Sequence, residues 1–115
     1  MGLTYVDGFV SSNGTKEPVT FLVDSGATYT VLPQAVWQQM GLKPKRTVSC
    51  SLADGTRLER SVSECMISLE QGESHTPVIL GEESDEALLG VVTLEILGLG
   101  LNPFERTLQQ MRVLL

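Results

Sequence analysis

Basic residues are scarce in this sequence, and their scarcity limits the partners that the chain can bind. Eight Lys and Arg residues stand against fourteen Asp and Glu residues, which gives a formal net charge of −6. Nucleic-acid binding requires a basic face that neutralises phosphates. The one local cluster, Lys43, Lys45 and Arg46, is small and is interrupted by Pro44. We therefore expect no nucleic-acid partner and interpret this cluster as a solvated loop.

Long apolar runs, cysteine pairs and metal-ligand clusters are also missing. No stretch approaches the ~20 apolar residues of a membrane span, and the N-terminus lacks a basic segment followed by an apolar run. We therefore expect a cytoplasmic protein with no membrane partner. Cys50 and Cys65 lack CxxC spacing, and His75 is the only histidine. This predicts no metal and no cofactor, while a disulfide between the two cysteines stays open.

Aromatic residues make up only 5% of the chain, so its core has to be built from Val, Leu and Ile. These residues favour strands. A length of 115 residues fits one domain, 1–115, and 11 Gly with 5 Pro indicate many turns. The sequence thus predicts an all-β fold of short strands with one or two short helices.

Alternation of polar and apolar residues places the expected elements. Two tight-turn signals, Asn13-Gly14 and Asp54-Gly55, predict hairpins. Helices are expected over 33–40 and 91–97, with Gly41 and Gly98 after their ends and Trp37 on a buried face. The acidic segment 81–86 is interpreted as a solvated loop. Strands are expected over 3–10, 18–23, 29–32, 47–52, 56–62, 65–70, 76–80, 87–90, 99–101 and 111–115.

The most informative segment is Asp24-Ser25-Gly26-Ala27, which follows the apolar run Phe21-Leu22-Val23. A carboxylate at the end of a buried strand is unfavourable unless it is hydrogen-bonded or functional. The next two residues offer a hydroxyl group and backbone donors, and the small Ala27 leaves room beside the acid. A plain turn after a strand would have the same sequence, so this segment alone leaves both interpretations open.

Four further segments, in a fixed order, extend the pattern over nearly the whole chain. After Asp24-Ser25-Gly26-Ala27 come Val31-Leu32-Pro33, the hairpin 51–56, Val78-Ile79-Leu80-Gly81, and Leu88-Leu89-Gly90 before a short helix. This arrangement resembles the retropepsin-like aspartic proteases, and most closely their small cellular and bacterial members. The resemblance implies a small closed acid-protease-like barrel. Segment 51–56 would be its flap hairpin, and Leu88-Leu89-Gly90 would pack against the catalytic loop.

The resemblance implies an aspartic endopeptidase that cleaves protein or peptide substrates. Such enzymes use two carboxylates that share one proton. Because this chain has a single Asp-Ser-Gly motif, a homodimer with the active site on its two-fold axis is implied. The catalytic residues would be Asp24, Ser25 and Gly26. The substrate-binding residues would be Ala27, Thr28, Leu52, Ala53, Asp54, Gly55 and Thr56.

Three positions depart from the viral members of that family. Thr28 and Tyr29 stand where viral members have an acid, and Val91 stands where they have an Arg. In the viral enzymes those charges pair near the dimer interface, so contacts and specificity cannot be transferred from them. The apolar run 111–115 is expected to contribute to an interface. The alternative function is a non-catalytic peptide-binding or dimerisation module of the same fold.

Overall fold

The first two strands form a hairpin that ends at Asp24. The computed structural model describes residues 2–115. Strands β1 (Tyr5–Ser12) and β2 (Thr15–Val23) pair antiparallel around Asn13 and Gly14, which have φ of 50° and 81°. Positive φ at both central residues is typical of a type I′ turn. The predicted hairpin is therefore confirmed, with strands that reach further toward the turn than 3–10 and 18–23 suggested.

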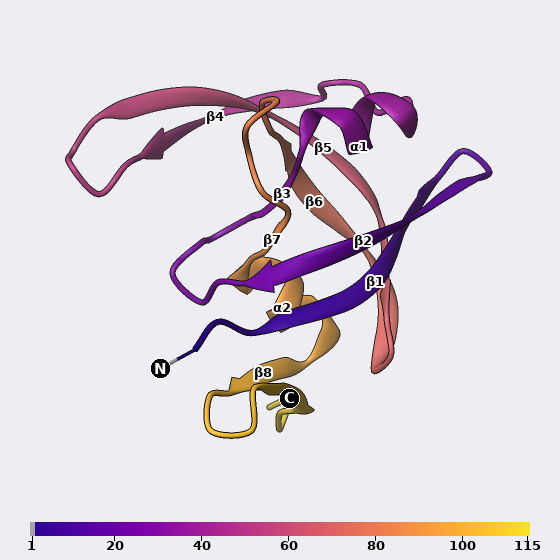
Figure 1. Cartoon of the computed structure of the whole chain (residues 1–115), viewed down its shortest axis with the longest axis vertical. Coiled ribbons are helices and arrows are strands. Elements are labelled where there is room, and N and C mark those ends of the chain that lie inside the picture. Colours follow the sequence, from indigo (N-terminus) through magenta and orange to yellow (C-terminus); the bar gives the residue numbers. More distant parts are fainter. Residues whose placement is uncertain (1) are drawn as a thin grey trace.

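Seven strands form one sheet in the order β1-β2-β7-β3-β6-β5-β4, and an additional pairing of β1 with β5 closes six of them into a ring (Figure 1). The closure confirms the predicted all-β fold. Strand β7 is parallel to β2, and β3 is parallel to β6. The other strands are β3 (Thr30–Leu32), β4 (Arg46–Ser51), β5 (Arg57–Leu69), β6 (Gly72–Leu80) and β7 (Leu88–Leu89).

Strand β5 is one continuous strand of 13 residues, whereas the sequence predicted two separate strands over 56–62 and 65–70. The polar pair Ser63-Glu64 suggested a break. In the structure both residues stay in register with β6, where Ser63 is opposite Val78. Ser63 is buried and Glu64 is exposed, so the alternation between the two faces continues through the pair. Neighbouring strands supply the backbone hydrogen bonds that keep β5 continuous.

The two predicted helices are present as α1 (Gln34–Gln39) and α2 (Val91–Leu97). Pro33 caps α1 instead of beginning it, so the predicted range 33–40 is one residue too long at each end. Trp37 packs partly buried against the core, and its Nε1–H donates to the Gly81 carbonyl at 2.8 Å. Helix α2 ends at Gly98, whose φ of 69° is left-handed, as the glycine predicted.

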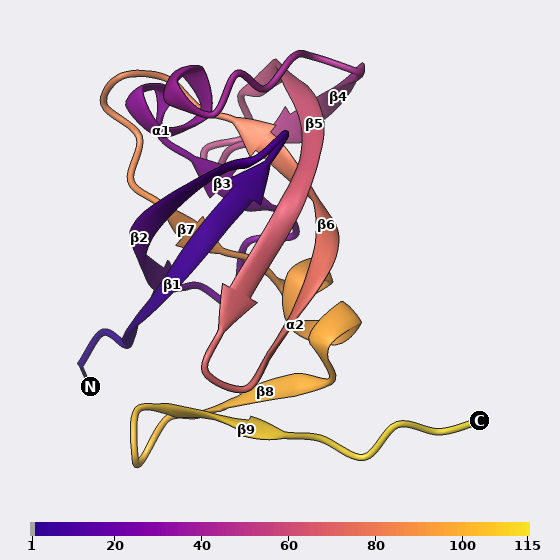
Figure 2. The same cartoon turned by 90° about the vertical axis from the view of Figure 1, so that its right-hand side faces the viewer.

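The C-terminal region departs most from the sequence prediction. Strands β8 (Leu99–Asn102) and β9 (Thr107–Gln110) form a separate two-stranded ribbon, while 111–115, predicted as a strand, has no regular structure. The tail is exposed and runs away from the body (Figure 2). Its apolar residues resemble a strand, but within residues 2–115 they pair with no other strand. The true strand, β9, was missed because three of its four residues are polar.

A contiguous core fills the interior of the ring. Its largest fully buried side chains include Phe21, Leu32, Ile67 and Leu89. Cys65 is buried and Cys50 is half-buried, and both are free thiols. Within residues 2–115, no helix is long and apolar enough to cross a membrane, and no three potential metal ligands gather in one place. The core residues are mainly aliphatic, as the low aromatic content of the sequence indicated.

Candidate active site

Asp24 lies directly after β2 and begins a tight turn. Its carboxylate Oδ1 accepts a hydrogen bond from the Gly26 amide at 2.9 Å, and its carbonyl accepts one from the Ala27 amide at 3.1 Å. A Cβ at Gly26 would lie 3.2 Å from Asp24 Oδ1, so glycine allows the turn to stay this tight. Asp24 is half-buried, whereas Ser25 and Gly26 are exposed. The turn thus fixes the carboxylate while leaving its surroundings open.

Backbone hydrogen bonds hold the Asp24 loop, residues 24–29, against the segment around β7 and the start of α2. The Asp24 amide donates to the Leu89 carbonyl at 3.1 Å. Two amides at the start of α2 donate in the other direction, from Val91 to Ala27 at 2.8 Å and from Val92 to Thr28 at 2.9 Å. The first amides of a helix have no partner inside it. Here the carbonyls of the Asp24 loop satisfy two of them.

Gly90 makes this close approach possible. A Cβ at this position would lie 2.4 Å from the Tyr29 carbonyl carbon and 2.8 Å from the Thr30 nitrogen, both backbone atoms that cannot turn aside. The Leu88-Leu89-Gly90 motif therefore packs directly beneath the loop that carries Asp24. Its glycine is required by space and not by φ, which is −93°.

The hairpin of β4 and β5 extends on the same side of the molecule as the loop between β2 and β3 (Figure 1). Its tip is a turn in which the Thr56 amide donates to Asp54 Oδ1 at 2.9 Å and Gly55 has a φ of 89°. Hydrogen bonds from the Thr56 amide and then its hydroxyl lower the pKa of the Asp54 carboxyl. The tip is exposed throughout and makes these contacts only within itself.

A cavity of about 550 Å³ lies between the Asp24 loop and strand β4. Of the predicted substrate-binding residues, Ala27, Thr28 and Leu52 line it, together with the predicted catalytic residue Gly26. The remaining lining residues are Tyr29, Val31, Val48, Ser49, Cys50, Ser51 and Ile79. Residues 48–51 were missed as candidates. The signal that could have identified them is their strand pattern immediately before the Asp54-Gly55 turn.

The other predicted site residues lie outside this cavity. Asp24 and Ser25 stand beside it on the same turn as Gly26, and 53–56 form the exposed tip of the β4–β5 hairpin. A smaller adjoining pocket of about 170 Å³ shares part of the cavity wall. It is lined by Val31, Cys50, Leu52, Leu58, Arg60, Ile79, Asp85, Glu86 and Leu88. Both spaces are therefore bounded by the β4–β5 hairpin on one side and by β3, β6 or β7 on the other.

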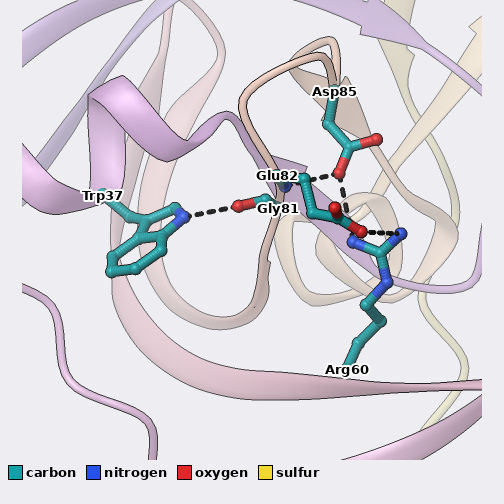
Figure 3. A network of polar contacts seen from close by, with 5 residues as sticks. All are labelled: Trp37, Arg60, Gly81, Glu82 and Asp85. Atoms are coloured by element: carbon teal, nitrogen blue, oxygen red, sulfur yellow. Dashed lines mark hydrogen bonds and ion pairs between the residues drawn. The ribbon is translucent and has the colours of Figure 1, made fainter.

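Two lining residues of the smaller pocket, Arg60 and Asp85, belong to an ion-pair network with Glu82 (Figure 3). Arg60 on β5 contacts Glu82 at 3.1 Å and Asp85 at 3.2 Å, and Asp85 also accepts a hydrogen bond from the Glu82 amide at 2.6 Å. The Arg60 side chain is only 21% exposed. The acidic segment 81–86 was interpreted as solvated. The segment is a loop, and the Glu82 side chain is 71% exposed, as that interpretation requires. Asp85 differs, because its side chain is only 33% exposed and pairs with a basic residue distant in sequence.

The closed sheet, the Asp-Ser-Gly turn at a strand end and the overhanging hairpin together define a retropepsin-like aspartic protease. Residues 10–95 match the family described as "gag-polyprotein putative aspartyl protease", and the chain belongs to this family. It is therefore a peptide hydrolase of the aspartic class. The matched range contains the Asp24 loop, the β4–β5 hairpin and the Gly90 motif. No curated protein sequence matches the chain.

Solved structures of three proteases are similar to this fold. A retropepsin-like aspartic protease from Rickettsia conorii has a TM-score of 0.63 and 25% identity over 88% of this chain and 77% of its own. The simian foamy virus protease has a TM-score of 0.58 and 22% identity over 81% and 93%. The EIAV protease, solved with the inhibitor HBY-793, has a TM-score of 0.58 and 22% identity over 80% and 86%.

Proposed function

We propose that this chain is an endopeptidase that acts as a homodimer, in which Asp24 of each copy supplies one of two catalytic carboxylates. The observation that carries this proposal is the single Asp-Ser-Gly turn, held firmly from below and exposed at Ser25 and Gly26. Aspartic protease chemistry needs two such turns face to face. One chain of this family provides one turn, so a second copy must provide the other.

The proposed reaction follows from placing two carboxylates side by side. Like charges this close cannot both ionise, so the pair holds one proton between them and titrates as a unit. The ionised carboxylate removes a proton from water, which attacks the peptide carbonyl carbon as the other carboxyl protonates the carbonyl oxygen. The C–N bond then breaks, and a proton passes to the leaving amine. The Gly26 amide orients Asp24 for this exchange. The Ser25 hydroxyl would link the two turns.

The substrate is proposed to bind as an extended strand between the flap hairpin and the Asp24 loop. Backbone pairing with a strand edge gives affinity, and alternate side chains enter pockets. The cavity beside Gly26 and the adjoining pocket have apolar walls that include Val31, Ile79 and Leu88. The flap tip, residues 53–56, would complete the site by closing over the bound peptide. Its self-contained turn leaves it able to move as a unit.

The exposed C-terminal tail supports the homodimer. Val113, Leu114 and Leu115 have relative exposures of 68%, 85% and 121%. An exposed apolar segment next to an unpaired strand edge is a pairing site for another chain. We propose that a second copy covers this tail, since symmetric pairing of the same surface gives a closed dimer.

The first experiment compares wild type with Asp24→Asn on a mixed peptide library at acidic and neutral pH, with sedimentation to confirm the dimer. Cleavage by wild type alone supports the proposal. Equal cleavage by both variants would contradict it. Peptide binding without cleavage by a confirmed wild-type dimer would instead identify a non-catalytic binding module.

A mixing experiment tests whether both carboxylates belong to one site. When wild type is mixed with an equal amount of Asp24→Asn and the subunits exchange, about a quarter of the dimers should keep both Asp24 carboxylates. Activity per dimer should fall to that fraction. The matched control is Glu95→Gln, which removes an exposed carboxylate elsewhere. A fall only to one half would show that each copy acts alone and would rule out the shared dyad.

A further inference from the structure

Three buried threonines from three elements form a chain of hydroxyl groups beneath the Asp24 loop. Thr93 Oγ1 on α2 lies 2.6 Å from Thr30 Oγ1 on β3 and 2.8 Å from Thr76 Oγ1 on β6. Their exposures are 1%, 0% and 2%. The Gly90 amide donates to Thr30 Oγ1 at 3.0 Å, and Thr76 Oγ1 donates to the Pro77 carbonyl at 3.4 Å.

The Pro77 end of this chain sets the direction of the hydrogen bonds in it. A hydroxyl group has one proton to donate and can accept two hydrogen bonds. Thr76 uses its proton on the Pro77 carbonyl, so Thr93 must donate to Thr76. Thr93 has then used its own proton, so Thr30 must donate to Thr93. The result is one ordered path from the Gly90 amide to the Pro77 carbonyl, with Thr93 at its centre.

This path holds the segment that in turn holds Asp24. Gly90 lies between Leu89, whose carbonyl accepts the Asp24 amide, and Val91, whose amide donates to Ala27. Helix α2 has only seven residues and no side-chain cap at its N-terminus. Such a short helix is unstable by itself and depends on tertiary contacts for its position. The Thr93 hydroxyl anchors it to two strands at once.

We infer that Thr93 is a positioning residue for catalysis, acting through Gly90 and Leu89 to set the place of the Asp24 carboxylate. This inference rests on the proposed catalytic role of Asp24. Thr93 does not line the cavity in which the substrate is proposed to bind. Its effect should therefore appear in the chemical step, because a displacement of about 1 Å at a reacting group lowers the rate by as much as 10²-fold.

The test compares Thr93→Val with Thr93→Ser. Valine has nearly the same shape but neither donates nor accepts, whereas serine keeps the hydroxyl. We expect Thr93→Val to lower kcat about 10- to 100-fold with KM nearly unchanged, and Thr93→Ser to retain most of kcat. Ile67→Val, a fully buried core change on β5, which carries none of the three threonines, controls for lost stability. Equal kcat for Thr93→Val and wild type would overturn the inference, as would equal losses in all three variants.

Amide hydrogen exchange gives a readout that does not depend on cleavage. In Thr93→Val the amides of Asp24, Gly90 and Val92 should exchange at least about tenfold faster than in wild type, because local opening becomes easier. The amide of Val10 in β1 should be unchanged. Uniform acceleration at all these positions would show a merely structural role and contradict the inference. If wild type fails to cleave any peptide, the proposed function fails while these exchange rates still decide the role of Thr93.

Discussion

Replacing Gly90 by alanine tests whether the contact beneath the Asp24 loop depends on space alone. The backbone of Gly90 has φ of −93° and ψ of 171°, which alanine adopts without strain. The added Cβ, however, would lie 2.4 Å from the Tyr29 carbonyl carbon and 2.6 Å from its oxygen. Ordinary contacts begin near 3.4 Å. The loop and the 88–90 segment must therefore separate by about 1 Å.

The size of the effect follows from what that separation breaks. Overpacking at a dense contact costs about 1–3 kcal/mol. A 1 Å shift also lengthens the hydrogen bonds of Asp24 to Leu89 and of Val91 to Ala27, which measure 3.1 and 2.8 Å, and each contributes about 1 kcal/mol. Alanine restricts the unfolded chain, which returns about 0.4–1 kcal/mol. We expect Gly90→Ala to lower the free energy of unfolding by about 3 kcal/mol.

Urea denaturation at one fixed protein concentration measures this change, because the stability of a dimer depends on concentration. Gly14→Ala is the matched control. Its Cβ would meet nothing within 4 Å, but its φ of 81° is unfavourable for alanine, so only backbone strain of about 1–2 kcal/mol is expected. Gly90→Ala should also abolish cleavage. A Gly90→Ala protein that is active and no less stable than Gly14→Ala would refute the steric argument.

Three further predictions concern groups away from the loop. Burial, and secondarily the charge of Glu64, raise the pKa of the Cys65 thiol from 9.0 to about 12; the folded chain therefore keeps a proton that the unfolded chain releases. The contribution of this thiol to the free energy of unfolding should be fully present below pH 9 and should fall by roughly 4 kcal/mol as the pH rises to 12. Alkaline denaturation measures this change, and Cys65→Ala should give a flatter profile of stability against pH. Trp37→Phe leaves the Gly81 carbonyl without its donor and should lower thermal stability by about 1–2 kcal/mol. Truncation after Gln110 should weaken dimerisation in sedimentation, and an unchanged dimer would contradict the proposed role of 111–115.

Local signals in the sequence predicted those elements that are determined locally. Asn13-Gly14 marked a hairpin because its two residues adopt the positive φ that the turn needs. Gly98 marked the end of α2 for the same reason. The closure of the sheet by β1 and β5, and the continuity of β5 itself, depend on pairing partners far apart in the chain, such as Phe9 with Ser68. Composition and alternation carry no information about such partners.

The candidate site divides in the same way. Asp24 could be proposed because a carboxylate after a buried strand is an unusual choice, and Gly90 because Leu88-Leu89-Gly90 resembles a motif of the retropepsin-like proteases. Thr30 and Thr93 could not, because single threonines are ordinary in strands and helices. Their hydroxyls meet across 63 residues of sequence. The pairing of Arg60 with Asp85 could not be predicted for the same reason, because an acidic loop has the same sequence whether it is solvated or paired with a distant basic residue.

The contacts of the two sides of the cleft indicate how rate and specificity can change separately. The Asp24 loop is held by backbone hydrogen bonds and buried hydroxyls, at Leu89, Val91 and Thr93. The opposite wall is formed by residues of β4 and by Arg60, which pairs with Glu82 and Asp85. Strand β4 contacts the Asp24 loop through the side chain of Arg46, which lies over the Tyr29 ring. Substitutions in the first set move the carboxylate and therefore act on kcat. Substitutions in the second set reshape pockets while the carboxylate stays in place, so they act on substrate choice. A chain built this way can acquire new specificity without rebuilding its catalytic turn.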